Sequence, residues 1–210
     1  MSLPEIKIFD TLTNEKRPLQ TIEPGKIKMY VCGVTVYDLT HIGHARVFIF
    51  FDVVQRFLRK SGFDVLYVRN HTDVDDKIIK RANELGEAPL DLAQRFIDAL
   101  DEDMGRLGVA NADIEPKVSD HIDQIIAMNE TLIEKGFAYA VDGDVYYRVQ
   151  QFDGYGKLSH RKLEDMEAGR SGRVDETSAK EHPFDFALWK SSKEGDVAWD
   201  SPWGLSLIHI

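Results

Sequence analysis

The chain has 210 residues, of which 43% are hydrophobic and 30% are charged, and its formal net charge is -10. This length and apolar content suffice for one large domain, or for one domain with a smaller insertion. The acidic excess opposes non-specific adhesion to nucleic acid or anionic membrane, although a local basic patch remains compatible with a nucleic-acid substrate. Because the chain has one cysteine, no recognisable signal sequence and no apolar run near the roughly 20 residues of a membrane span, we expect a cytoplasmic protein that does not cross a membrane.

The first third of the chain predicts a strand, a helix and a second strand. Residues 28–37, KMYVCGVTVY, are rich in β-branched and aromatic residues and predict a buried strand. Apolar residues recur at spacings of three and four from Ala45 to Lys60, and Gly62 follows, which predicts an amphipathic helix. Residues 63–69, FDVLYVR, predict a second strand. Such a unit builds a parallel sheet, so we expect an α/β nucleotide-binding architecture.

Helical spacing continues in the next part of the chain. It predicts helices over residues 77–85, 91–107 and 121–135. Thr72 and the acids Asp73, Asp75 and Asp76 precede the first of these helices and offer an N-cap and first-turn charges. The acids could be mistaken for a D-x-D metal site, but at a helix start we interpret them as partners of the helix dipole.

The pattern changes after residue 136. Residues 137–149 alternate around Asp142-Gly143-Asp144, which predicts a β-hairpin, and residues 151–181 are polar and predict loops with a short helix. Apolar character returns at PFDFALWK, where we expect the chain to re-enter its main domain. The predicted organisation is half of a nucleotide-binding domain over residues 1–114, an insertion over 115–180, a return to the main domain over 181–204 and a tail over 205–210.

Two histidines stand three apart around a glycine where the first strand should pass into the first helix. A helix start exposes N–H groups that bind anions, and the imidazoles of His41 and His44 could add donors to a phosphate oxygen. Gly43 between them leaves the backbone open to a flat ring. The pair is also compatible with half of a zinc site or with surface histidines. Neither a Walker loop nor a G-x-G-x-x-G motif occurs at this turn.

These motifs resemble those of a known family. The stretch His41-Ile42-Gly43-His44 resembles the HIGH signature of class I aminoacyl-tRNA synthetases. The surrounding stretches YVCGVTVYD, YVRN, TDVDDKII, FDFALWKSSKEG and SPWG resemble those of cysteinyl-tRNA synthetases and extend over nearly the whole chain. The resemblance implies a Rossmann-like (HUP-type) parallel sheet, incomplete in this chain, with a connective insertion that carries the hairpin. It also implies activation of cysteine with ATP and Mg²⁺ to cysteinyl-adenylate, and transfer to tRNA(Cys).

The resemblance also implies roles for particular residues. His41 and His44 would contact the ATP phosphates and stabilise charge in the transition state, and Gly43 would lie beneath the adenine. The substrate contacts that it implies are Gly33, Thr35 and Thr72. Thr72 also fits a helix N-cap, and the two roles are compatible.

Cys32 has two interpretations. A lone cysteine in a strand is most often a small buried hydrophobe. In the family that the chain resembles, the matching cysteine is one ligand of a Zn²⁺ ion that binds the substrate thiolate. A soft thiolate binds zinc well whereas serine's hydroxyl does not compete, so such an ion would select cysteine without an editing site.

Parts of the family pattern are absent or different. The family's other zinc ligands and its KMSKS loop lie beyond SPWG, whereas residues 205–210 depart from the pattern, so we expect a non-native or read-through tail and give His209 no role. We therefore expect a fragment that is inactive alone. The alternatives are a non-catalytic nucleotide-binding module and the related cysteine–amino sugar ligase of mycothiol synthesis, against which HIGH and DDKIIKRA favour the tRNA enzyme.

Two further features stand outside the main motifs. His71 occupies a position where the family more usually carries an apolar residue. Four basic residues could contact a tRNA acceptor stem or belong to a solvated loop, namely Arg161, Lys162, Arg170 and Arg173.

Overall fold

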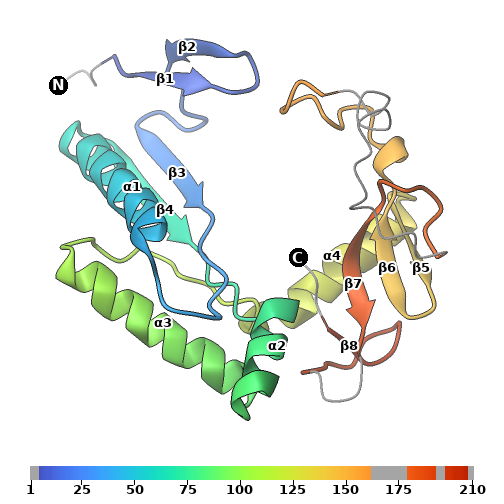
Figure 1. The fold of residues 1–210 in the computed structure, drawn as a ribbon. Coiled ribbons are helices and arrows are strands. Elements are labelled where there is room, and N and C mark those ends of the chain that lie inside the picture. The colour runs from blue at the N-terminus through green and yellow to red at the C-terminus, as the bar shows by residue number, and fades with distance from the viewer. Residues whose placement is uncertain (1–4, 162–178, 193–196, 208–210) are drawn as a thin grey trace. The chain divides into compact units, whose positions relative to one another are not determined.

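A computed structural model of the chain describes residues 5–161, 179–192 and 197–207 (Figure 1). The contacts divide it into two compact units. The first unit comprises residues 1–6 and 18–121, and the second comprises residues 7–17 and 122–210. No helix in the described ranges is long and apolar enough to cross a bilayer.

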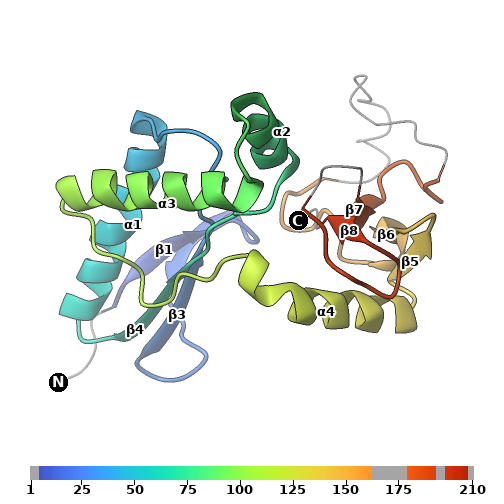
Figure 2. The ribbon, with the colours of Figure 1, turned by 90° about the horizontal axis from the view of Figure 1, so that it is seen from below.

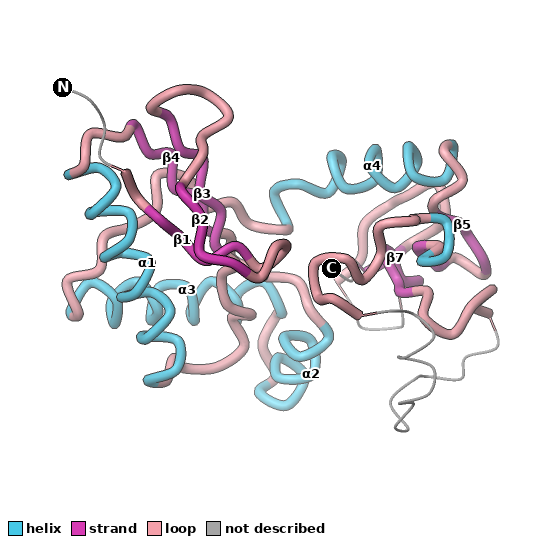
Figure 3. The backbone as a smooth tube through the Cα atoms, turned by 90° about the horizontal axis from the view of Figure 1, so that it is seen from above, coloured by secondary structure: helices cyan, strands magenta, loops and turns pink. Residues whose placement is uncertain are grey.

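The first unit contains a parallel sheet, as predicted. Strand β3 (Lys26–Val31) pairs in parallel with β4 (Asp64–Arg69), and the crossover between them is helix α1 (Ile42–Lys60). Figure 3 shows the two strands as neighbouring magenta segments. Parallel strands need a long connection, which α1 supplies, so the predicted strand, helix and strand unit is confirmed.

Strand β3 differs from the predicted buried strand over residues 28–37. It ends at Val31, and burial alternates along it, with Tyr30 60% exposed and Val31 8% exposed. Cys32 follows the strand and is exposed, so the interpretation of Cys32 as a buried hydrophobe is wrong. The strand ends early because the backbone N–H of Gly33 donates to the side chain of Asn70 and not to a neighbouring strand.

Single bridges continue the parallel pairing around β4. They join Thr35 to Thr72, Val68 to Ile114, and His71 to Lys117. The backbone N–H groups of Arg69 and His71 donate to the carbonyls of Ile114 and Pro116 at 3.1 and 2.9 Å. Residues 113–117 therefore run beside the end of β4, and the segments that follow both strands lie close together.

Helix α2 (Asp76–Leu85) corrects the expected roles of the residues before it. Its N-cap is Asp75, whose carboxylate accepts from the Lys77 N–H at 2.8 Å, so the N-cap prediction for Thr72 is wrong. Asp73 is buried and its carboxylate accepts from the N–H and hydroxyl of Ser119. Thr72 and Asp73 lie outside the helix because Thr72 still pairs in parallel with Thr35.

Helix α3 (Pro89–Arg106) completes the core of the first unit. It packs on α1 through a cluster that includes Phe48 and Leu100, and on α2 through a cluster that includes Ile78 and Leu92. Figure 2 shows α3 crossing α1, with α2 near its other end. Val34 packs against both clusters, so the segment between β3 and α1 is anchored to the core.

The second unit contains the predicted hairpin. Strands β5 (Ala138–Val141) and β6 (Asp144–Tyr147) pair around Asp142 and Gly143, whose φ angles are 52° and 87°. Strand β7 (Phe186–Ser191) pairs with β6, and β8 (Ser206–Leu207) pairs with β7, so residues 186–191 continue the sheet of the hairpin.

The remaining elements are β1 (Lys7–Asp10) paired with β2 (Glu15–Pro18), α4 (Ile122–Glu134), and the 3₁₀ helices η1 (Ser119–His121, in the first unit) and η2 (Val149–Gln151). The domain boundaries stay a prediction.

Candidate active site

Two imidazoles cap the N-terminus of α1. His41 is the N-cap, and its Nδ1 accepts from the Gly43 N–H at 3.1 Å. His44 Nδ1 accepts from the His41 N–H at 3.3 Å, and the two rings stack with centroids 3.8 Å apart. A hydroxyl and a carboxylate or amide usually form this reciprocal capping box, whereas two histidines form it here. A ring nitrogen that accepts a hydrogen bond carries no proton, so in this cap the ring proton of each imidazole lies on Nε2.

This arrangement gives the helix start two side-chain donors. Each Nε2–H remains available to an acceptor, because Nδ1 of each ring serves the cap. Burial lowers the pKa of His44, and the neighbouring His41 lowers it further, so the neutral donor form of His44 is favoured. Together with the dipole of α1, the two rings suit a phosphate oxygen.

Gly43 has a local role that the sequence analysis did not predict. A Cβ at this position would lie 2.9 Å from Cε1 and 3.0 Å from Nδ1 of the His41 ring. The absent side chain therefore lets the His41 imidazole fold over the backbone and cap the helix. The predicted position of Gly43 beneath an adenine stays a prediction.

A pocket of about 360 Å³ lies beside the start of α1. Its lining residues are Cys32, Gly33, Val34, Thr35, Tyr37, His44, Val47, Phe48 and Lys77. The structure thus brings four of the predicted site residues to one pocket, while His41, Gly43 and Thr72 do not line it. Lys77 adds a positive charge that was not predicted, with its Nζ 5.6 Å from the centre of the Tyr37 ring.

The thiol of Cys32 is exposed at the wall of this pocket. Burial and the neighbouring Cys32 raise the pKa of the Tyr30 hydroxyl. Accessibility and a soft sulfur donor fit one ligand of a zinc ion. Within the described parts of the chain, no group of three potential metal ligands includes Cys32. A zinc ion held by three or more side chains at Cys32 would therefore need at least one ligand from outside the described residues.

For the basic residues of the insertion, a contact with a tRNA acceptor stem stays a prediction. Arg161 is exposed and belongs to the second unit. The other three, Lys162, Arg170 and Arg173, lie outside the described residues, as does His209.

Asn70 organises the pocket wall, and the sequence analysis gave it no role. Its Oδ1 accepts from the Tyr30 hydroxyl at 2.8 Å and from the Gly33 N–H at 2.9 Å. Its Nδ2 donates to the Thr72 hydroxyl at 3.2 Å. Asn70 thereby holds two predicted substrate contacts, Gly33 and Thr72, in one network. The signal in the sequence was its position at the end of a parallel strand, where ligand-binding residues of open α/β sheets lie.

Replacing Asn70 tests this network. We expect Asn70→Ala to lower the free energy of unfolding by about 1–3 kcal/mol, because it removes the partner of the part-buried Gly33 N–H and Thr72 hydroxyl. Tyr30→Phe is the matched control, since it removes one exposed hydrogen bond and should cost less. Urea unfolding of both variants measures the difference. Equal losses of unfolding free energy in the two variants would show that Asn70 does not hold Gly33 and Thr72 in place.

The parallel strand, helix and strand unit with paired histidines at the start of the helix agrees with a class I aminoacyl-tRNA synthetase catalytic domain. The chain belongs to the family of tRNA synthetases class I (C) catalytic domain, whose model matches residues 18–206. The prediction of a Rossmann-like α/β fold is thus confirmed.

Relatives and solved structures agree with this assignment. The chain is 55% identical over 202 residues to the cysteine–tRNA ligase of Trichormus variabilis and 57% identical over 200 residues to that of Anaeromyxobacter dehalogenans. Each match covers 95% of this chain but only 42% and 41% of the respective relative, so the chain spans about two fifths of their length. Mycobacterium tuberculosis methionyl-tRNA synthetase in complex with methionyl-adenylate resembles it with a TM-score of 0.60 and 15% identity, over 87% of this chain and 44% of that chain, which supports the fold alone.

Proposed function

We propose that the chain is the N-terminal part of the catalytic domain of a cysteine–tRNA ligase. The complete protein would activate cysteine with ATP and Mg²⁺ and transfer it to tRNA(Cys), in the cytoplasm. The observation that carries this proposal is the shared pocket, whose wall contains the exposed Cys32 thiol together with His44 of the helix start. Identity of 55% to a cysteine–tRNA ligase supports the same substrate.

The first chemical step would take place at the start of α1. A carboxylate oxygen of cysteine attacks the α-phosphorus of ATP, a new phosphorus–oxygen bond forms, and pyrophosphate leaves with the bonding electrons. Negative charge grows on the phosphate oxygens during this step. The Nε2–H groups of His41 and His44 would stabilise that charge as preorganised donors, together with the positive end of the α1 dipole. Positioning does the rest, without a covalent intermediate on the protein.

Recognition of cysteine would depend on residues around the pocket. We propose that Gly33, Thr35 and Thr72 contact the amino acid, with Asn70 holding the first and last of them in place. Cys32 would bind a zinc ion together with ligands from elsewhere in the complete protein, and that ion would bind the substrate sulfur as a thiolate. A serine hydroxyl would not replace that bond, so discrimination would arise at binding.

ATP–pyrophosphate exchange by the complete protein tests this function. We expect exchange with cysteine, and none above background with serine or methionine. Transfer of labelled cysteine to tRNA(Cys), and not to an amino sugar, tests the second step and excludes the mycothiol-type ligase. For residues 1–210 alone we expect nucleotide binding without exchange. Absence of cysteine-dependent exchange in the complete protein would overturn the proposal.

A further inference from the structure

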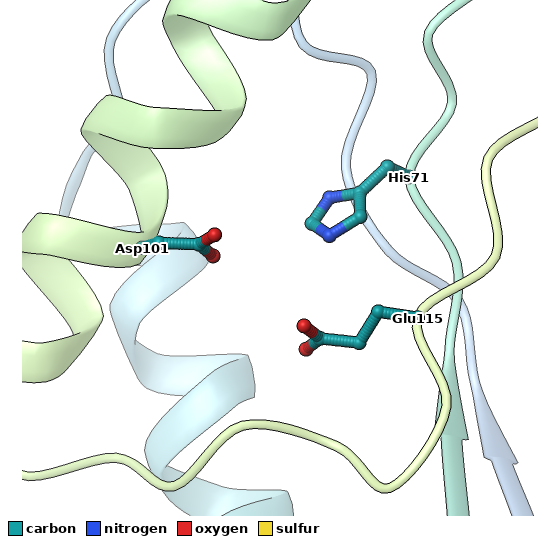
Figure 4. Close-up of side chains that lie close together, drawn as sticks. All are labelled: His71, Asp101 and Glu115. Atoms are coloured by element: carbon teal, nitrogen blue, oxygen red, sulfur yellow. The ribbon is translucent and has the colours of Figure 1, made fainter.

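A second group of potential ligands lies inside the first unit, away from the phosphate site. His71, Asp101 and Glu115 each offer one ligand atom, and these atoms all lie within 4.8 Å of one another. Figure 4 shows the three side chains converging from separate segments. His71 follows β4, Asp101 belongs to α3, and Glu115 lies in the segment that runs beside the end of β4. None of the three lines the pocket of Cys32 and His44.

His71 has a buried nitrogen that lacks a partner. Its side chain is 3% exposed, and Nδ1 has no hydrogen-bond partner. Leaving a buried polar atom unpaired costs about 1–3 kcal/mol, so such an atom in a folded protein calls for an explanation. Figure 4 shows the ring directed into the space between the carboxylates of Asp101 and Glu115. A ligand bound there would lie directly against the buried imidazole.

The carboxylate of Glu115 is oriented for a further contact. Its Oε1 accepts from the Ala112 N–H at 3.1 Å and from the guanidinium of Arg69. These donors fix the carboxylate on one side and leave Oε2 for another ligand. Hydrogen bonds of this kind commonly orient the carboxylates that bind metals in proteins.

The charges of the cluster favour a cation. Asp101 and Glu115 bring two negative charges, and Arg69 brings one positive charge that is directed at Oε1 of Glu115 and lies over the Phe48 ring, 4.2 Å from its centre. Lys117 also lies near His71, and its Nζ donates to the side chain of Gln94.

We propose that His71, Asp101 and Glu115 bind one divalent transition-metal ion of the Zn²⁺ or Mn²⁺ type. One imidazole nitrogen and two carboxylate oxygens form a donor set that suits such ions. The ion would join the segment after β4, which carries Asn70 and Thr72, to α3 and to residues 113–117. It would therefore stabilise the segment after β4, whose Asn70 supports the wall of the substrate pocket. This site needs no ligand from outside the chain, unlike the zinc proposed at Cys32.

Cobalt titration of the chelator-treated chain tests the proposal. We expect one Co²⁺ ion to bind with visible d–d bands, to raise the melting temperature, and to give no thiolate charge-transfer band in the near ultraviolet. Cys32→Ser should change none of these readings. Asp101→Asn and Glu115→Gln should each weaken binding at least about tenfold, the loss typical even of residues that only support a metal ligand.

Asp91→Asn is the matched control, because Asp91 lies in the first turn of the same helix and outside the cluster. It should bind Co²⁺ like the unsubstituted chain. The unsubstituted chain decides the question even if one carboxylate variant fails to fold. Absence of Co²⁺ binding to the folded chain would overturn the proposal, and so would binding that Cys32→Ser abolishes or that both carboxylate variants retain.

Discussion

In the complete protein, His41→Asn should reduce the rate of cysteinyl-adenylate formation by about 10²–10³-fold while leaving the fold intact. Asparagine is among the best N-cap residues, so its side-chain oxygen can accept from the Gly43 N–H as Nδ1 of His41 does. It cannot place a donor where Nε2–H of the imidazole lies. The expected loss is that of one preorganised donor to a developing oxyanion. Single-turnover formation of the adenylate measures the rate, and urea unfolding should show a change within about 0.5 kcal/mol.

His41→Ala provides the comparison that separates the cap from the donor. It removes both the cap and the donor, so it should lose as much activity as His41→Asn. Its free energy of unfolding should also fall by about 1 kcal/mol. His44→Ala should resemble it, since His44 accepts from the His41 N–H. An activity of His41→Asn within about tenfold of the unsubstituted protein would refute a donor role for His41.

Gly33→Ala should destabilise the first unit by an amount on the order of 3–4 kcal/mol. A Cβ on Gly33 would lie 1.6 Å from the backbone carbonyl oxygen of Asn70, so one of the two backbones must move. The Gly33 N–H is bonded to Asn70 Oδ1, and the segment after β4 is held by its pairing with residues 113–117. Neither can shift without loss of hydrogen bonds. Urea unfolding measures the loss, and adenine nucleotide binding should weaken with it.

Gly105→Ala is the matched control for this substitution. Gly105 lies inside α3, and a Cβ there would meet nothing within 4 Å. Alanine has a higher helix propensity than glycine, so the free energy of unfolding of this variant should rise by about 0.5–1 kcal/mol. If Gly33→Ala were as stable as the unsubstituted chain, the close approach of Gly33 to Asn70 would not exist in solution.

The regular elements of the first unit could be predicted because their signals are local. The spacing of apolar residues indicated α1, and Gly86, with a φ angle of 70°, ends α2 where the pattern placed its end. The end of β3 could not be predicted. Apart from Gly33, the residues after Val31 are as β-prone as those before it, and the strand ends there because Asn70, distant in the sequence, accepts from the Gly33 N–H.

The candidate site also has some features that the sequence predicts and others that only the fold brings together. A short motif at a helix start predicts His41 and His44 as phosphate-binding residues, and the resemblance to a family predicts Cys32 as a zinc ligand; these roles stay predictions. The tautomers of the two histidines, the role of Asn70 and the meeting of His71 with Asp101 and Glu115 could not be predicted. Parallel pairing places the carboxyl ends of β3 and β4 at one edge, where segments far apart in the chain come into contact. Such contacts depend on how elements pack, and no local sequence pattern records them.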